Sequence, residues 1–152
     1  MWVAAEPPDM RYLIATDGST LGDEAVRYAA RQAVAFDATL VIAHVLTPDS
    51  ELIDGTLVLP GEEAAVEEGE RVLENARSVA VDVADGEGAG IDVETQLLTG
   101  RPADAITEFA GETDADAIFV GHRGLSEERE QVVGSVAKSV VDKAVVPVTV
   151  IR

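Results

Sequence analysis

Cysteine is absent from the 152 residues, which excludes a disulfide framework, a thiolate metal site and a cysteine nucleophile. Long apolar runs are also absent. The run over residues 40–46 contains His44 and is far shorter than the roughly 18 residues that a membrane-spanning helix needs. The sequence begins Met1-Trp2-Val3, with no basic segment followed by an apolar stretch, so no signal peptide is predicted. These absences predict a soluble, cytoplasmic protein that has no membrane partner.

Basic residues are scarce. Lys and Arg number 11 against 29 Asp and Glu, the net charge is −18, and lysine occurs only at Lys138 and Lys143. The negative electrostatic potential of such a chain repels nucleic acids and anionic lipids, whose recognition usually begins with a basic patch. The hydrophobic fraction of 47% is too high for a disordered chain. The composition resembles that of proteins from salt-adapted cells, where molar salt shortens the Debye length to about 3 Å. It therefore predicts a halophilic protein, with an ordinary acidic protein as the alternative.

The hydrophobic pattern predicts a loose lead-in over residues 1–9 and a single domain over residues 10–152, in which strands and helices alternate. Strands are expected at 12–16, 39–45, 91–97, 115–120 and 146–151, and the helices between them begin near Thr20, Gly61, Pro102 and Ser135. Residues 46–59 read as an irregular connection. A segment long enough to form a crossover helix separates each strand from the next. This pattern indicates an α/β doubly wound parallel sheet of five strands and four helices. Polar residues alternate along 91–97, which is typical of an edge strand.

The first helix carries two further predictions. Thr20 and Asp23 have the spacing of a capping box, so Thr20 is expected to begin the helix. The apolar stripe that this helix buries is predicted to consist of Leu21, Ala25, Ala29, Ala33 and Phe36.

The strongest motif follows the fourth predicted strand. Gly121-His122-Arg123-Gly124 is separated by nine residues from Gly134-Ser135, which begins a helix. Glycines allow the backbone to approach a ligand closely, and a helix N-terminus offers N–H groups to an anion. This pattern is typical of a phosphate cradle, although ordinary loop glycines and a helix cap would look similar. Asp17-Gly18-Ser19, after the first strand, is either a carboxylate for ribose or Mg²⁺ or a simple turn.

Other motifs exclude several classes of protein. No G-x-x-x-x-G-K-[ST] sequence is present, which excludes a P-loop ATPase, and the glycines of residues 85–90 precede a strand, unlike those of a dinucleotide fingerprint. No histidine pair indicates a zinc site. His44 is expected to be buried and hydrogen-bonded, and His122 either lines the phosphates or is a structural residue. Ser135 has no G-x-S-x-G context and no evident base.

The glycine spacing resembles the signature of the ATP-binding branch of the universal stress protein family, and the acidic composition suggests a haloarchaeal member. Residues 15–19 (Ala-Thr-Asp-Gly-Ser), 43–45 (Ala-His-Val) and 146–150 (Val-Pro-Val-Thr-Val) agree with it. This resemblance covers nearly the whole chain, from Arg11 to Arg152. It implies a flavodoxin-like sheet with the strand order 3-2-1-4-5. A receiver-type signalling domain is disfavoured, because residues 97–99 (Leu-Leu-Thr) offer no aspartate to phosphorylate.

The resemblance also implies a site and an activity. Adenine would lie against Ala15, Thr16 and Val45, with Asp17 at the mouth. Phosphates would be held by Gly121, Arg123, Gly124, Gly134, Ser135, Val136 and Ala137. Two features depart from the family: His122 stands where a small hydroxyl residue is common, and the loop contains three glutamates, Glu127, Glu128 and Glu130.

The implied function is binding of ATP, or of ADP or AMP, with Mg²⁺ or Mn²⁺ held through the phosphates. The protein would act in the stress response as a homodimer joined through strand 146–151. Turnover is expected to be slow or absent, because no side chain is an evident base for an attacking water. A slow ATP hydrolase or adenylyl-transfer enzyme, and a nucleotide-free structural module, are the alternatives.

Overall fold

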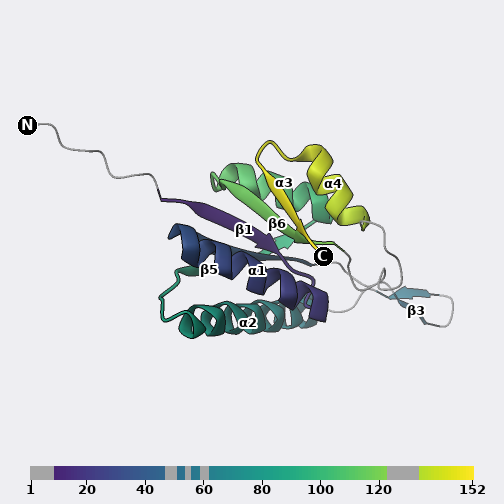
Figure 1. Ribbon diagram of the computed structural model, residues 1–152. Coiled ribbons are helices and arrows are strands. Elements are labelled where there is room, and N and C mark those ends of the chain that lie inside the picture. The colour runs from purple at the N-terminus through teal and green to yellow at the C-terminus, as the bar shows by residue number, and fades with distance from the viewer. Residues whose placement is uncertain (1–8, 47–50, 54–55, 59–61, 123–133) are drawn as a thin grey trace, which may run out of the picture.

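In the computed structural model, a parallel sheet lies between two layers of helices (Figure 1). The structure describes residues 9–46, 51–53, 56–58, 62–122 and 134–152. The sheet has the order β5-β2-β1-β6-β7, and each pair of neighbours is parallel. Its strands are β1 (Arg11–Ala15), β2 (Thr39–Leu46), β5 (Val93–Thr99), β6 (Ala117–Gly121) and β7 (Val148–Ile151). The five-stranded sheet with the order 3-2-1-4-5 is thereby confirmed.

Four helices cover the two faces of this sheet. One face packs against α1 (Thr20–Phe36) and α2 (Glu62–Gly86), and the other against α3 (Pro102–Glu112) and α4 (Ser135–Lys143). Both faces of the central strands are therefore buried, which explains why these strands are almost wholly apolar. Leu13 and Ile14 on β1 and Ile42 on β2 are each 0% exposed. None of the helices among the described residues is both long and apolar enough to cross a membrane.

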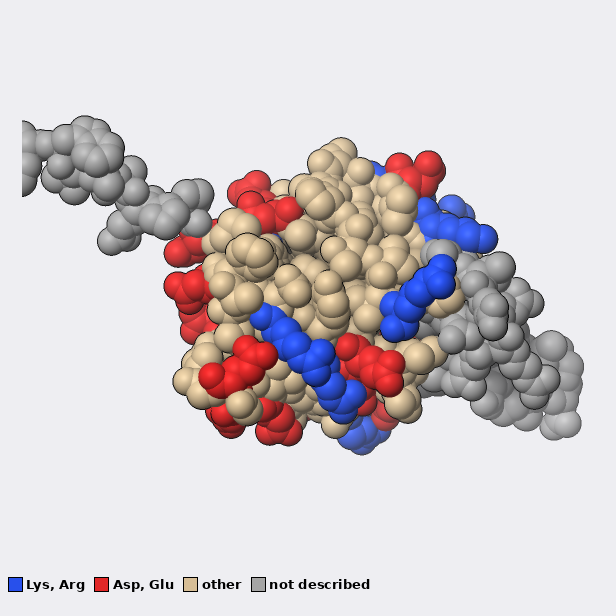
Figure 2. Space-filling model, in the orientation of Figure 1, with Lys and Arg blue, Asp and Glu red and all other residues tan. Residues whose placement is uncertain are grey.

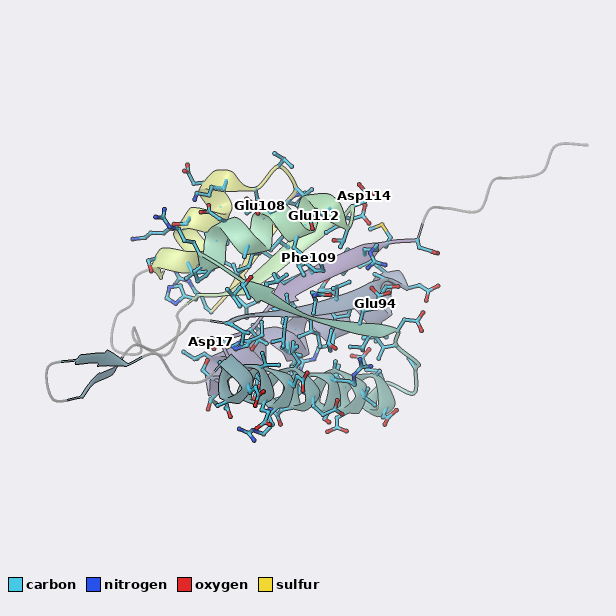
Figure 3. All side chains as sticks on the ribbon, turned by 180° about the vertical axis from the view of Figure 1, so that it is seen from behind. Asp17, Glu94, Glu108, Phe109, Glu112 and Asp114 are labelled. Carbon is cyan, nitrogen blue, oxygen red and sulfur yellow. The ribbon has the colours of Figure 1, made fainter. Side chains whose placement is uncertain are left out.

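Strand β5 lies at the edge of the sheet, as its alternating pattern predicts. Val93 and Leu97 pack against the core on the α2 side, whereas Glu94 and Gln96 are exposed. The side-chain view shows Glu94 on the outer strand, away from the cover of α2 (Figure 3). Because α3 reaches only part of this face, the alternate side chains of β5 contact water and are polar.

Helix α1 begins at Thr20, as predicted, but its capping residue is Ser19, whose hydroxyl oxygen accepts a hydrogen bond from the Gly22 N–H. The prediction that Phe36 is buried is wrong. Phe36 is 59% exposed, although its ring stands edge-on to Tyr12 at 6.3 Å. Phe36 lies in the last turn, beside the left-handed Asp37 that ends the helix, and solvent therefore reaches one side of the ring.

Residues 46–59 contain a hairpin that the sequence analysis missed. Strands β3 (Glu51–Ile53) and β4 (Thr56–Val58) pair antiparallel and form a small sheet of their own. Figure 1 shows this hairpin projecting from the main body. Asp54-Gly55, between short apolar runs, is a typical hairpin-turn sequence, so the signal was present. The other predicted elements have the expected order, with ends that differ by a few residues.

Candidate functional site

The carboxyl ends of the strands meet at one edge of the sheet, between β1 and β6. From β1 the chain passes into α1 on one face, and from β6 it leads toward α4 on the other face (Figure 1). This divergence makes a topological switch point, which is where open α/β sheets bind ligands. The predicted site residues flank this point: some follow β1 and β2, and the others follow β6 and begin α4.

The turn between β1 and α1 holds Asp17 in one orientation. The Asp17 Oδ1 atom accepts hydrogen bonds from the Ser19 N–H at 3.0 Å and the Ser19 hydroxyl at 2.5 Å. Gly18 has a φ of +81°, which few other residues adopt, and its N–H donates to Thr16 Oγ1 at 3.2 Å. Asp17 therefore lies on a rigid turn, and Figure 3 shows it at the edge of the molecule where α4 also begins.

Two glycines let the helices approach this turn closely. A Cβ atom on Gly18 would lie 2.9 Å from Cγ2 of Val72 on α2. A Cβ atom on Gly22 would lie 2.6 Å from Thr16 Oγ1 and 3.0 Å from Asp17 Oδ1. Neither position has room for a side chain without movement of its neighbours. Gly22 was not predicted from the sequence, although a glycine within a helical pattern often indicates a close approach.

Thr16 is tied to the end of β2. It is 5% exposed, its N–H donates to the Ala43 carbonyl at 3.0 Å, and His44 Nδ1 lies 2.8 Å from the Thr16 carbonyl oxygen. Ala15 pairs with Ala43 in the parallel register of β1 and β2. Ala15 and Thr16 are thus joined to Ala43 and His44, which immediately precede Val45 on β2, and the expectation that His44 is hydrogen-bonded is confirmed. His44 is only half-buried.

Backbone hydrogen bonds bring together the two ends of the glycine motif. Gly121 ends β6, and the next residue, His122, donates its N–H to the Ile151 carbonyl on β7 at 2.6 Å. The His122 carbonyl oxygen then accepts the Gly134 N–H at 2.7 Å. Two residues of the motif, Arg123 and Gly124, lie outside the described residues. The residues on either side of this loop nevertheless lie at a single point beside the start of α4.

The start of α4 has no side-chain cap from its N-cap residue. Its N-cap, Gly134, has extended backbone (φ −63°, ψ 159°) and supplies no side-chain hydrogen bond to the first turn. In that turn Ser135 and Val136 are exposed, and Ala137 is buried against the sheet. The first N–H groups of a helix have no partner within the helix, and together with the helix dipole they favour an anion. His122 is 6% exposed, so its side chain belongs to the interior.

Several basic side chains lie at this edge of an acidic protein. Arg101 follows β5, Lys138 belongs to the first half of α4, and Arg152 follows β7, and all three are exposed. Figure 2 shows a group of blue side chains on the side where the strands end in Figure 1. At the other end of α4, Lys143 donates a hydrogen bond to the Asp104 carboxylate and thereby lowers the pKa of Asp104. Within the described ranges, no group of three or more His, Asp or Glu could hold a metal ion.

Comparisons with known proteins agree with this geometry. The sequence profile of the universal stress protein family matches residues 10–152. A universal stress protein of Methanocaldococcus jannaschii is 32% identical over 149 residues, covering 93% of this chain and 81% of that protein. The crystal structure of a universal stress protein in complex with cAMP is similar with a TM-score of 0.71 and 27% identity, covering 94% of this chain and 97% of the other.

A third similar protein comes from Archaeoglobus fulgidus. The structure of its universal stress protein in complex with dAMP has a TM-score of 0.70 and 28% identity, covering 94% of this chain and 98% of that one. The match of the family profile and the similarity of whole folds lead to the same conclusion. The chain belongs to the universal stress protein family.

Proposed function

We propose that this protein binds ATP at the carboxyl edge of the sheet, between β1 and β6. The observation that carries this proposal is the hydrogen bond from the Gly134 N–H to the His122 carbonyl at 2.7 Å. It brings the two ends of the glycine motif together at an α4 N-terminus that has no side-chain cap. Backbone N–H groups in this arrangement are suited to phosphate oxygens. Complexes of similar family members with cAMP and dAMP support an adenine nucleotide.

The proposed ligand divides between two parts of the site. Adenine and ribose would contact the residues that follow β1 and β2: Ala15, Thr16, Asp17 and Val45. The phosphates would contact Gly121 together with Gly134, Ser135, Val136 and Ala137 at the start of α4, and Arg123 and Gly124 on the loop. The basic side chains of Arg101, Lys138 and Arg152 favour this placement. They reduce the repulsion between the phosphates and a chain of net charge −18.

We infer that Mg²⁺ or Mn²⁺ accompanies ATP through the phosphates. Asp17 is the carboxylate that follows the central strand, and its orientation is fixed by Ser19. One carboxylate suits the partial coordination of Mg²⁺, which usually retains several waters. Slow turnover or none is expected, since the Asp17 Oδ1 atom already accepts two hydrogen bonds from Ser19 and is not arranged as a base for water.

Calorimetric titration of ATP in molar KCl tests the site with two matched variants. Gly134→Val places a branched side chain at the proposed cradle and should abolish ATP binding. Gly90→Val is the control, because Gly90 also lies in coil before an element and nothing lies within 4 Å of its Cβ position. The control should bind ATP like the wild type. Wild-type protein that binds no adenine nucleotide would overturn the proposed function.

Mass spectrometry can identify the resting ligand independently. Freshly purified protein would be denatured, and the released small molecules would be identified. ATP, ADP or AMP in near-equal amount to the protein would support the proposal. Release of ADP from added ATP at a useful rate would instead favour a slow hydrolase.

We further propose a cytoplasmic homodimer that pairs through β7. This strand ends the sheet, and all four of its residues are half-buried and apolar or Thr. The carbonyls of Pro147 and Ile151 accept hydrogen bonds from Ile118 on β6 and from His122 just after it. The alternating pattern therefore directs the backbone of Val148 and Val150 outward. Unpaired outward groups on an apolar edge favour pairing with another strand. Two copies would form a self-complementary two-fold contact.

Val150→Pro tests the dimer, because it removes an outward N–H and leaves the hydrogen bonds to β6 intact. Sedimentation in molar KCl should show a dimer for the wild type and a monomer for this variant. Val145→Ser is a suitable control, since Val145 is 94% exposed and lies outside the strand. A monomeric wild type would contradict the proposed dimer.

A further inference from the structure

The His44 ring completes the backbone hydrogen bonding of Thr16. Strand β1 ends at Ala15, and the pairing of β1 with β2 ends at Ala15 and Ala43. The Thr16 N–H still reaches the Ala43 carbonyl at 3.0 Å, but no further pair of the ladder follows. At this point His44 Nδ1 lies 2.8 Å from the Thr16 carbonyl oxygen. A carbonyl oxygen can only accept, so Nδ1 carries the proton and donates.

Helix α2 limits the room available to this ring. A Cβ atom on Gly69 would lie 3.5 Å from His44 Cδ2, 2.6 Å from Leu97 Cδ2 and 2.7 Å from Leu46 Cδ2. The helix therefore approaches the end of β2 at a distance that only glycine permits. The Thr16 carbonyl at Nδ1 and the nearby α2 backbone both favour this orientation of the ring.

The consequence of this contact extends to Asp17. Thr16 Oγ1 accepts the Gly18 N–H, and the next residue along the chain, Asp17, accepts both hydrogen bonds from Ser19. A rotation of the peptide group between Thr16 and Asp17 would move the whole turn. The His44 donor opposes that rotation, because it would lose a part-buried hydrogen bond.

We propose that His44 is a positioning residue of the nucleotide site, which fixes the Thr16 carbonyl and so the adenine and ribose end of the pocket through its Nδ1–H donor. This inference rests on the proposed function, since it assigns Thr16 and Asp17 to the ligand. The ring acts on the shape of the backbone and does not touch the phosphates. Loss of the donor should therefore weaken adenosine and ATP by the same factor.

Two substitutions separate the donor from the volume of the ring. His44→Leu fills similar space without a donor, whereas His44→Asn retains an N–H₂ group near the position of Nδ1. His44→Leu should weaken both adenosine and ATP about two- to tenfold, the effect of losing one hydrogen bond. His44→Asn should bind both ligands within about twofold of the wild type.

Arg77→Leu is the matched control for a purely structural contact. Arg77 on α2 donates from Nη1 to the Val93 carbonyl at 3.1 Å, so it also joins a side chain to a strand, but at the first residue of β5, far from the carboxyl edge. Its loss should lower stability against urea and leave ligand affinity unchanged. Affinities would be measured by calorimetry under conditions in which every variant is folded.

The outcomes distinguish this inference from the proposed function. A wild type that binds no adenine nucleotide overturns both. A wild type that binds ATP, with a His44→Leu variant of equal affinity, overturns the positioning role alone. Equal losses in His44→Leu and His44→Asn would also overturn it, because the donor would then be irrelevant.

Discussion

Gly69 provides a quantitative test of how α2 is packed on the end of β2. Glycine within a helix costs about 1 kcal/mol relative to alanine, so Gly→Ala in a helix normally stabilises a protein. At Gly69 the new methyl group would lie 2.6 Å from Leu97 Cδ2 and 2.7 Å from Leu46 Cδ2. Contacts between carbon atoms are most favourable at about 3.5–4.0 Å. The methyl group must therefore displace two leucine side chains or the helix.

The expected change in the free energy of unfolding of Gly69→Ala is the difference between an overpacking cost and a gain in helix propensity. Overpacking of a filled interior usually costs 1–3 kcal/mol. Leu46 and Leu97 are only partly buried, and their methyl ends can move in part, so we take about 2 kcal/mol. Subtracting the gain in helix propensity of about 1 kcal/mol leaves a net loss near 1 kcal/mol in the free energy of unfolding. Gly69→Ala should therefore destabilise the protein.

Gly111→Ala supplies the control. Gly111 lies in the last turn of α3, and nothing lies within 4 Å of its Cβ position. This variant gains helix propensity without a clash and should be more stable than the wild type by about 0.5 kcal/mol, since it lies near a helix end. Urea unfolding in molar KCl measures both, with the midpoint compared at constant slope. Equal stabilisation by the two alanines would refute the close approach of α2.

Salt and pH give two further tests. If the charge of −18 opposes folding, the melting temperature should rise steeply from dilute buffer to molar KCl as like charges are screened, and a flat series would contradict the halophilic interpretation. Burial, and to a lesser extent the Asp116 carboxylate, raises the pKa of Tyr12 above 10.0. The folded state thus retains a proton that the unfolded state releases, and stability should fall as the pH rises above about 10. Tyr12→Phe should reduce this loss, and a slope of stability against pH that equals that of the wild type would contradict the argument.

The architecture was predictable because burial determines the pattern of most elements. Strands β1, β2 and β6 are covered on both faces and are therefore almost wholly apolar, whereas β5 is covered on one face and alternates. Competition between similar local choices explains the errors. Ser19 and Thr20 are adjacent hydroxyl residues, and either could cap α1. In the structure Ser19 is the cap, and its hydroxyl also donates to Asp17, a contact that capping rules do not include. The Phe36 prediction was wrong because helical spacing does not indicate where the core ends.

The candidate site was predictable in part. Spacing alone singled out Gly121 and Gly134, and in the structure the residue after Gly121, His122, accepts a hydrogen bond from the Gly134 N–H through its carbonyl oxygen. The role of both glycines in binding stays a prediction. The hydrogen bond between His44 and Thr16 could not be predicted in this way, because it joins residues 28 apart in the chain, one on β2 and the other just after β1. Gly69 shows the same limit: its position within α2 suggests a close approach, but only the fold reveals that β2 and β5 lie opposite.

The two parts of the proposed site are built by different means, and this predicts how their variants differ. The adenine end depends on side chains, since His44 and Ser19 hold the backbone at Thr16 and the carboxylate of Asp17. The phosphate end depends on backbone amides, with Gly134 held by a main-chain bond. Changes at His44 should therefore leave the ratio of ATP affinity to adenosine affinity constant. Gly134→Val should lower that ratio, because adenosine has no phosphate to lose. The ratio thus locates a defect within the pocket even when two variants bind ATP equally weakly.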